Sequence, residues 1–584
     1  MTASQLKLVF TYPAVAHILL ASTSQGMLAA SPVKIVLVGD STVNPQGGWG
    51  PGFGASFDRD FTVVNLAANG RSSKSFRDEG RWEPALTAKP TFILIQFGHN
   101  DVPGKVPDRE TDPQTTYRQN LLKYVEEALK AGATPVLVTS IVRRNFDADG
   151  KWKPDSLVPY VEAVRALGAS QNIPVMDLYR LTEGQARQLG NAGCEAQVGA
   201  IDKDGKPDHT HLAPQGQASI GAMAAKEFTR LFPEFEARRH ELVPWRKSLD
   251  QNADWYWSAE AIRIAGNLLT YQHDNGGFEK NIDMALPLES PRLDEVVKRK
   301  PEAETTIDND ATWTQMRFLA KVHLQTHDPA YAFALRKAMR FLLAAQYANG
   351  GWPQFYPLRH GYWDHITYND DAMIGVMRVL RDIAEGEAEW ALFTAEERRL
   401  AEAAVLRGVS VILKTQVKVD GKLTVWCAQH DEVTLEPAMA RKYELVSLSG
   451  SESVGVVEFL MDISHPSREV INAVQGAVAW FAKSGILGIE VKTVPAPGTP
   501  RGVDRVVAVA SAGVPTQWAR FYEIGTNRPI FSGRDSVKKY SMAEIEYERR
   551  NGYRWYTDRP ARMLSVEYPA WRKKWAVAAD ARVR

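Results

Sequence analysis

An aspartate and two histidines fall within four consecutive residues, Asp208 to His211, in the stretch PDHTHLAPQG. A His-x-His pair can bind a metal ion, whereas an Asp-x-x-His pair can orient an imidazole as a general base. A polar loop without chemistry is the third interpretation. The spacing alone leaves these alternatives open, and the choice depends on what the rest of the chain provides.

Three further polar clusters directly follow apolar runs and supply the other groups that ester hydrolysis needs. Ser41 follows VKIVLVG, Gly70 lies in NLAANGRSS, and Asn100 lies in FGHND. The reaction requires a hydroxyl nucleophile, a base, a carboxylate that orients the base, and donors for the oxyanion. We therefore expect a triad of Ser41, His211 and Asp208, with the N–H groups of Ser41 and Gly70 and the side chain of Asn100 as oxyanion donors.

A sheet must bring these residues together. Five short apolar runs in residues 33–232 alternate with helical patterns such as YRQNLLKYVEEALKAGA, and the runs are VKIVLVG, FTVVNLA, TFILIQFG, TPVLVTSIV and IPVMDL. This alternation predicts an α/β doubly wound parallel sheet of the flavodoxin-like type, in which sites gather at the carboxyl ends of the strands.

The order of these motifs is itself informative. Gly-Asp-Ser, the glycine of the second cluster, Gly-x-Asn-Asp and Asp-x-x-His resemble the SGNH hydrolases, and GDSTV, GRSSKSF and GHND are similar to their rhamnogalacturonan acetylesterase branch, carbohydrate esterase family twelve. The resemblance implies removal of acetyl groups from pectic polysaccharide without a cofactor. Zinc binding then lacks a third ligand, and His209 is expected to be structural. His99 either contacts substrate or holds its loop.

The second half of the chain contains internal repeats. NLLTYQHDNGGFEKN, which begins at Asn267, recurs as FLLAAQYANGGWPQF from Phe341, with ILKTQVKVDGKLTVW as a fainter third copy, and NDATWTQMRFL recurs as DDAMIGVMRVL. Each unit is typical of a helix that ends in a Gly-rich loop before another helix. Repeated helical hairpins predict a short α/α toroid. Alternation after residue 485 adds an antiparallel β portion.

Two carboxylate clusters occupy corresponding places in these repeats. TIDNDAT contains Asp308 and Asp310, and TYNDDAM contains Asp370 and Asp371. Asp310 and Asp371 precede apolar helical runs and are candidates for helix capping. Oxygen ligands from neighbouring loops also suit calcium, and a carboxylate pair can be the acid and base of a glycosidase.

Two arginines favour a polyanionic substrate over a neutral glycoside. Arg441 in ARKYELVSLSGSES and Arg528 in EIGTNRPIFSGRD stand among small and polar residues, where cations beside carboxylates suit an anionic polymer. Residues 250–584 also resemble polysaccharide lyase family ten, the pectate lyases, in TIDNDATWTQMRFLAKVH, NGGWPQFYPLRHGYWDHITYNDDAM, WCAQHD and RFYEIGTNRPIFSGRDSVKKYSMAEIEYERRNGYRWY.

This second resemblance implies calcium-dependent β-elimination of polygalacturonate. It assigns Arg441 as the catalytic base and Arg528 to substrate binding, with Asp308 and Asp370 as the first calcium ligands before Asp310 and Asp371. Further candidates for substrate contact are Lys280, Arg359, Asp364 and His365. A guanidinium with a pKa above about 12 is a poor base at neutral pH, so this role rests on the resemblance, and an alkaline optimum is expected.

The overall composition limits the other possibilities. The chain has 584 residues and a formal net charge of +1, so it has no overall positive charge that would attract nucleic acid. It has two cysteines, too few for a disulfide framework. We expect a signal segment over 1–30, an esterase domain over 32–235, a linker over 236–250 and a lyase domain over 251–584. Because residues 1–30 resemble a secretory signal, the protein is expected to be secreted or periplasmic, and no later apolar run is long enough to span a membrane.

The sequence thus predicts a bifunctional enzyme that acts on pectic polysaccharide, either polygalacturonate, acetylated pectin or rhamnogalacturonan. Two alternatives remain at this point. One half can be a carbohydrate-binding module beside a single active half, or the first half can be a lipid esterase joined to a helical scaffold.

Overall fold

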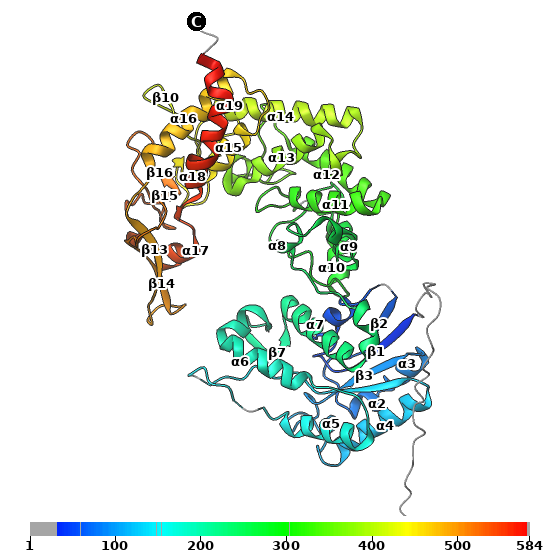
Figure 1. Cartoon of the computed structure of the whole chain (residues 1–584). Helices are drawn as coiled ribbons and strands as arrows, with labels where there is room; N and C mark the ends of the chain where they lie inside the picture. Colours follow the sequence, from blue (N-terminus) through cyan, green and yellow to red (C-terminus); the bar gives the residue numbers. More distant parts are fainter. Residues whose placement is uncertain (1–31, 59, 148, 154, 303, 581–584) are drawn as a thin grey trace, which may run out of the picture.

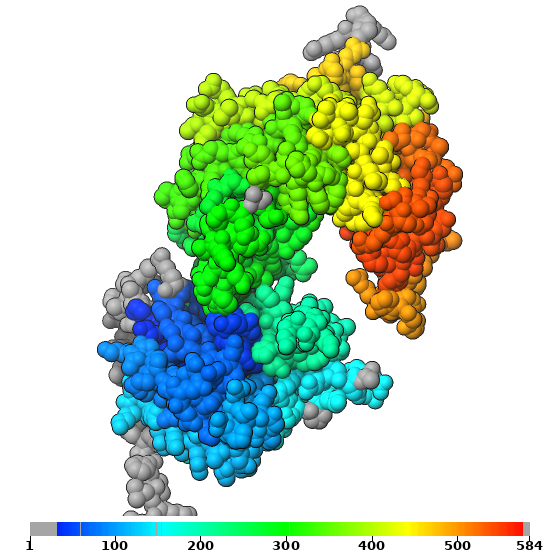
Figure 2. Space-filling view, turned by 180° about the vertical axis from the view of Figure 1, so that it is seen from behind, coloured from blue at the N-terminus to red at the C-terminus, as the bar shows by residue number. Residues whose placement is uncertain are grey.

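The computed structural model describes residues 32–580 except 59, 148, 154 and 303, so the predicted signal segment lies outside the described residues. The described residues form two bodies, one that begins with β1 and ends with α7 (blue to teal) and one that runs from α8 to α19 (green to red) (Figures 1 and 2). Cys194 and Cys427 are both buried and free. Within the described part, no helix combines the length and apolarity needed to cross a membrane.

The first body is built on a five-stranded parallel sheet, as the sequence predicts. Its strands lie in the order β2-β1-β3-β4-β5. They are β1 (Val33–Gly39), β2 (Phe61–Asn65), β3 (Phe92–Gln96), β4 (Thr134–Val138) and β5 (Val175–Met176). In this order the chain leaves β1 and β3 toward opposite sides, which makes their carboxyl ends the topological switch point where ligands bind. Ser41 and Asn100 follow these two strands.

Helices cover both faces of the sheet, because the apolar residues of β1 are buried almost without interruption along the strand (Figure 1). Val36 and Val38 of β1 pack with the face that α4 and α5 cover, whereas Ile35 and Leu37 pack with α1 and α7. The helices of this body are α1 (Gly50–Gly54), α2 (Ser75–Asp78), α3 (Glu83–Thr87), α4 (Thr116–Lys130), α5 (Val158–Gln171), α6 (Leu178–Gln197) and α7 (Pro214–Leu231).

The Asp208–His211 segment differs from a simple loop after the last parallel strand. It lies in β7 (Pro207–Leu212), which pairs antiparallel with β6 (Gly199–Ile201) in a separate hairpin. Its residues alternate in exposure along the strand, and the long helix α6 separates the hairpin from β5 in the chain. The histidine is therefore delivered to the sheet edge by a hairpin.

The segment between the bodies is bonded to both. The N–H of His240 donates to the carbonyl of Ser56 in the first body, and the N–H of Trp245 donates to Asp283 Oδ1 in the second. Its short helices are η1 (Pro233–Arg238), α8 (Trp245–Ser248) and η2 (Ala253–Trp257).

The second body is mainly helical. Helices α9, α12, α14 and α16 contact one another in succession, and α11, α13 and α15 form a second such row. The helices are α9 (Ala259–Tyr271), α10 (Arg292–Arg299), α11 (Trp313–Thr326), α12 (Pro329–Ala345), α13 (Ala372–Glu385), α14 (Ala395–Thr415), α15 (Glu452–Met461), α16 (Arg468–Ser484), α17 (Tyr547–Gly552), α18 (Arg559–Arg562), α19 (Tyr568–Asp580) and the short turns η3 (Tyr362–Asp364), η4 (Asn369–Asp371), η5 (Ala388–Trp390), η6 (Met542–Glu544) and η7 (Met563–Glu567).

The repeated glutamines explain why the repeats stack. The side-chain amides of Gln272, Gln346 and Gln416 each donate to a carbonyl of their own loop and to a carbonyl of the next outer helix. In the first two copies the loop glycines Gly276 and Gly350 have φ of +98° and +104°, and a Cβ there would clash with the backbone of that same helix. The repeated sequence motif therefore corresponds to a repeated contact between neighbouring helices. The glutamine of the faint third copy makes the same contact.

Only part of the expected β portion forms extended strands. β13 (Ile489–Pro495) and β14 (Val503–Val509) make an antiparallel hairpin. RPIFSG, which we expected to alternate as a strand, makes only isolated bridges. The remaining strands have two residues each: β8 (Ile366–Thr367), β9 (Lys418–Val419), β10 (Lys422–Leu423), β11 (Gln429–His430), β12 (Leu448–Ser449), β15 (Trp518–Ala519), β16 (Phe521–Tyr522) and β17 (Tyr556–Thr557).

Candidate functional sites

The predicted triad residues form one continuous hydrogen-bonded chain. The Nε2 atom of His211 lies 2.9 Å from the hydroxyl oxygen of Ser41, and its Nδ1 atom lies 2.7 Å from Oδ2 of Asp208. The other carboxylate oxygen of Asp208 accepts the backbone N–H groups of Thr210 and His211. This is the geometry in which a carboxylate orients an imidazole toward a hydroxyl.

The hydrogen bonds also control the charge of Asp208. Burial by itself would raise the pKa of Asp208, but the bonds from His211 and Thr210 outweigh it and lower that pKa. The carboxylate therefore stays ionised at neutral pH and can stabilise a protonated His211.

A buried arginine holds the hairpin that carries the triad histidine. The guanidinium of Arg144 donates to the carbonyls of Asp208 and His211, at 2.8 and 2.7 Å. Burial lowers the pKa of Arg144 to about 10. His209 projects to the surface, and its carbonyl accepts the N–H of Arg144, which agrees with a structural role.

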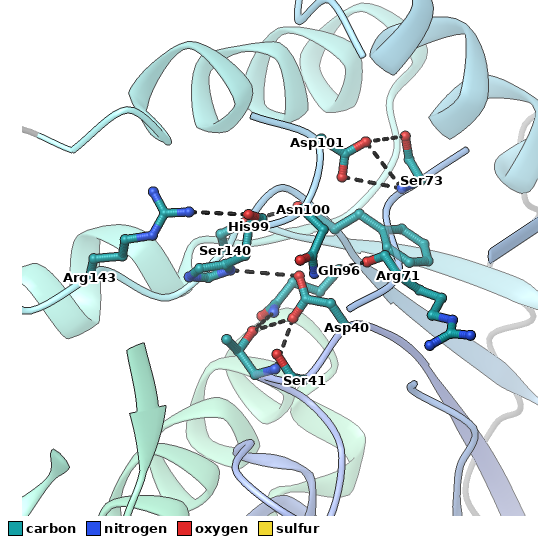
Figure 3. A network of polar contacts seen from close by, with 12 residues as sticks. Asp40, Ser41, Arg71, Ser73, Gln96, His99, Asn100, Asp101, Ser140 and Arg143 are labelled. Atoms are coloured by element: carbon teal, nitrogen blue, oxygen red, sulfur yellow. Dashed lines mark hydrogen bonds and ion pairs between the residues drawn. The ribbon is translucent and has the colours of Figure 1, made fainter. Parts of the chain in front are cut away.

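The predicted oxyanion donors lie on adjoining loops. Gly70 has a φ of +72°, and the side-chain amide of Asn100 donates to the carbonyl of the next residue, Arg71, at 3.2 Å. The labelled side chains of Ser41 and Asn100 lie on neighbouring segments in Figure 3. Asn100 is nearly buried, so its amide is held in a fixed direction.

The carboxylate clusters of the second body lie at the starts of two inner helices. The residue pairs Asn309–Asp310 and Asp370–Asp371 all have positive φ, between +49° and +64°. This shared backbone turn precedes α11 and α13. Capping by Asp310 and Asp371, which we considered, is wrong: neither side chain accepts a backbone N–H of its helix. In this left-handed conformation the side chains turn away from the helix end.

Instead, these carboxylates meet cations. Asp308 pairs with Lys280 at 2.5 Å, Asp370 with Arg520 at 3.0 Å and Asp371 with Arg559 at 2.9 Å. One oxygen of Asp308 and one of Asp371 are buried without a hydrogen-bond partner among the described residues.

Asp310 lies within electrostatic reach of the other three carboxylates. Burial, and then the negative charges of Asp371, Asp370 and Asp308, raise the pKa of Asp310. Carboxylate oxygens, some of them unpartnered, have the donor chemistry that a hard divalent cation takes, and in the described residues no three of these four aspartates bring oxygens within 4.8 Å of one another.

Arg441 is held by a neighbouring glutamate. Its Nε and Nη2 atoms donate to the two oxygens of Glu444, at 2.8 and 2.5 Å, and the guanidinium lies over the rings of Tyr443 and Tyr553. Burial alone would lower the pKa of Arg441, but the bonds to Glu444 outweigh it and raise that pKa above its usual range. In this arrangement Arg441 is a cation.

The other predicted substrate contacts fall into separate places. Lys280 and Arg359 each lie 5.2 Å from the ring centre of Phe355. Asp364 pairs with His360, and His365 pairs with Glu432 at 3.2 Å.

Arg528 is exposed and stacks 3.7 Å from the ring centre of Tyr540. Trp352, in contrast, is a core residue whose indole N–H donates to Leu342.

Sequence reasoning missed several residues that position the sites. Arg520 is buried and bridges Asp370 and Glu452, although these residues lie far apart in the chain. The others are Arg144, Glu444 and Arg559. The quoted motifs contain Glu444 and Arg520, but no spacing rule distinguishes a positioning side chain from its polar neighbours.

Comparisons with known proteins find relatives of both bodies of the chain. A family model described as pectic acid lyase matches residues 272–564, and a model described as the GDSL-like lipase/acylhydrolase family matches residues 32–218. A rhamnogalacturonan acetylesterase of Bacillus subtilis (strain 168) is 32% identical over 216 residues, which is 34% of this chain and 91% of the relative. A family 10 polysaccharide lyase from Cellvibrio cellulosa is 35% identical, covering 56% of this chain and 94% of that one, with a TM-score of 0.47.

Proposed function

Because the chain belongs to the pectic acid lyase family and its first body to the GDSL-like lipase/acylhydrolase family, we propose that it is a bifunctional pectin-degrading enzyme. The first body removes acetyl groups from pectic polysaccharide, and the second cleaves polygalacturonate by β-elimination. The observation that carries the first half is the chain of bonds from Ser41 through His211 to Asp208.

In the esterase reaction, the hydroxyl of Ser41 attacks the acetyl carbonyl while Nε2 of His211 takes its proton. Asp208 holds Nδ1–H and stabilises the imidazolium that forms. The N–H groups of Ser41 and Gly70 and the amide of Asn100 stabilise the oxyanion. His211 then protonates the departing sugar hydroxyl, and water releases acetate from Ser41 by the same steps.

A cation beside this site supports an acidic sugar chain as the substrate. A Cβ at Gly70 would lie 3.2 Å from Nη1 of Arg109, so the glycine lets this guanidinium rest against the backbone of the oxyanion loop. Across the described ranges, Arg109 has no carboxylate partner within ion-pair distance. A free guanidinium suits the carboxylate of a uronate residue.

For the lyase reaction, we propose that Asp308 and Asp370 hold a calcium ion, with Asp310 and Asp371 as further ligands. The unpartnered oxygens of Asp308 and Asp371 support this assignment. When bound, calcium would neutralise the substrate carboxylate and so acidify the proton on the adjacent carbon. Lys280, Arg359 and Arg528 bind other carboxylates of the polymer, and Asp364 and His365 contact its hydroxyl groups.

Arg441 is proposed as the base that removes this proton. Its pairing with Glu444 keeps it protonated in the structure described above. The role therefore requires that substrate binding part the two side chains and that nearby positive charge lower the pKa of the guanidinium. An alkaline optimum follows, because the reactive form is the deprotonated one.

The two rows of helices support a short α/α toroid as the frame of the lyase site. The inner row carries the aspartates at the starts of α11 and α13. A polymeric substrate cannot enter a cell, so we also propose that the enzyme acts outside the cytoplasm.

The test measures both reactions on one chain. Ultraviolet absorbance of unsaturated uronides is followed on polygalacturonate and on acetylated pectin, with calcium and with chelator, and acetate release is measured in parallel. Wild type is expected to give calcium-dependent absorbance on both substrates, and Ser41→Ala to be impaired only on the acetylated one. No absorbance on polygalacturonate with calcium at alkaline pH would refute the lyase and leave the second body as a binding module.

A further inference from the structure

A second acid–imidazole pair lies beside the triad and has no part in the esterase reaction described above. Asp40 directly precedes Ser41, and His99 directly precedes Asn100, so the pair joins the chain neighbours of the nucleophile and of an oxyanion donor. Oδ2 of Asp40 lies 3.6 Å from Nδ1 of His99 (Figure 3). Asp40 is 0% exposed and His99 is 3% exposed.

One oxygen of Asp40 is firmly bonded. Oδ1 accepts the N–H and the hydroxyl of Thr42, at 2.8 and 2.7 Å. The same hydroxyl accepts from Gln96, whose Oε1 accepts the indole N–H of Trp49 at 2.9 Å. This chain fixes Asp40 to β3 and to the buried core, and it directs Oδ2 toward His99.

The facing atoms, in contrast, are unsatisfied. Oδ2 of Asp40 and both ring nitrogens of His99 are buried without a hydrogen-bond partner among the residues described. Buried polar atoms without partners cost free energy, and these are complementary in chemistry. Their separation exceeds a charge-assisted hydrogen bond by less than an ångström. Hydrogen bonds of catalytic sites are often long in the free enzyme and shorten when the substrate binds.

The imidazole is too deeply buried to touch substrate. Of the two roles considered for His99, holding the loop is therefore the one that fits. On the far side of the loop, the guanidinium of Arg143 donates to the carbonyl of His99 at 3.1 Å and is itself paired with Asp155. Arg143 therefore holds the backbone of His99, while the imidazole ring of His99 faces Asp40.

We propose that Asp40 and His99 are a positioning pair that fixes the oxyanion donor Asn100 relative to the nucleophile Ser41. The hydrogen bond between them forms fully as negative charge develops on the substrate oxygen. This inference rests on the proposed esterase function of the first body. It predicts that the pair acts on the transition state and leaves substrate affinity almost unchanged.

The test compares His99→Ala, His99→Gln, Asp40→Asn and the double variant Asp40→Asn/His99→Ala on p-nitrophenyl acetate. Loss of one oxyanion donor typically costs roughly 10²- to 10³-fold, so misplacing one is expected to lower kcat by about 10- to 100-fold with KM within about twofold. His99→Gln retains a donor toward Asp40 and should recover part of the loss. The double variant should lose no more than the worse single variant, because the two residues act as one unit.

Ser56→Ala is the matched control for stability. Its buried hydroxyl donates to the carbonyl of Gly52. The neighbouring Phe57 stacks on Phe61 at the start of β2, so this site lies at the amino-terminal ends of the strands, whereas Ser41 follows the carboxyl end of β1. This variant should lower the melting temperature without changing kcat. A His99→Ala enzyme that keeps kcat within twofold, or whose loss adds fully to that of Asp40→Asn, would overturn the inference.

A second measurement separates this inference from the esterase proposal. Labelling of Ser41 by a fluorophosphonate requires the nucleophile and the oxyanion donors but no sugar ester. The labelling rate of His99→Ala should fall by the same factor as kcat, and an unchanged rate would overturn the positioning role. If wild type is labelled but releases no acetate from pectin, the substrate proposal fails while the role of the pair is still decided.

Discussion

Replacing Asp208 by asparagine tests the triad at the atom that sets the histidine tautomer. Oδ1 of Asp208 accepts two backbone N–H groups, at 2.7 and 2.9 Å, whereas Oδ2 faces Nδ1 of His211. In Asp208→Asn the amide oxygen must keep the position that accepts the two N–H groups. The amide nitrogen then donates to Nδ1 and forces the ring proton onto Nε2, which faces Ser41.

An imidazole that carries its proton on Nε2 cannot accept the proton of Ser41. We expect kcat/KM to fall by about 10⁴-fold, or roughly 5 kcal/mol in activation free energy. Asp208→Ala should be no more damaging, because it leaves the tautomer free. The assay is acetate release from acetylated pectin and hydrolysis of p-nitrophenyl acetate, with lyase activity of the same preparation as the folding control.

An Asp208→Asn enzyme within about tenfold of wild type would refute this reasoning. It would mean that the bond from Asp208 to His211 does not select the tautomer, although the backbone bonds orient the carboxylate. Loss of both esterase and lyase activity would instead indicate misfolding of the whole chain.

Three further predictions follow from single contacts. Burial raises the pKa of Asp101 to about 7 from an ordinary value of 3.8, so the contribution of Asp101 to stability falls as pH rises through about 7. Asp101→Asn should therefore reduce the loss of stability between pH 5 and 8, measured as melting temperature against pH. A melting temperature that depends on pH as steeply as in wild type would contradict this prediction. Gln416→Leu removes the side-chain hydrogen bonds to the carbonyls of Thr424 and Ala473 and should destabilise the lyase body by about 1–3 kcal/mol in denaturant unfolding, whereas Gln251→Leu, which removes a single solvent-exposed hydrogen bond, should not. Arg109→Gln should lower kcat/KM for acetylated polyuronate about tenfold but not for p-nitrophenyl acetate, with Lys130→Ala on α4 as the charge control, and equal loss on both substrates would argue against a carboxylate contact.

The sequence predicts the parallel sheet and the hydrogen-bonded grouping of Ser41, His211 and Asp208. Continuous apolar runs predict buried strands, and parallel strands bring Ser41 and Asn100 to one edge of the sheet. The hairpin that carries His211 was not predicted, because four of the six residues in PDHTHL are polar and the segment lacks a strand signal. The role of Arg144 was missed because its partners are the backbone carbonyls of Asp208 and His211. Every residue has such a carbonyl, so the sequence does not indicate which ones accept a hydrogen bond.

The aspartates show where spacing misleads. Asp310 and Asp371 precede helices at positions typical of caps, yet the left-handed turn at each pair directs the side chains elsewhere. Such φ values are uncommon for residues other than glycine and are tolerated best by Asn and Asp. The residue types were therefore a signal for the turn itself, and only the conformation separates a cap from a converging carboxylate.

The charge balance of the lyase site suggests how metal and substrate depend on each other. Asp308, Asp370 and Asp371 are each paired with a cation of the chain, so a divalent ion that binds these carboxylates shares them with Lys280 and two arginines, whose positive charges oppose its own. A polyuronate substrate offers these cations new carboxylate partners. The metal and the polymer thus each reduce the electrostatic cost of binding the other. By linkage, the polymer should increase the affinity for the metal by the same factor by which the metal increases the affinity for the polymer.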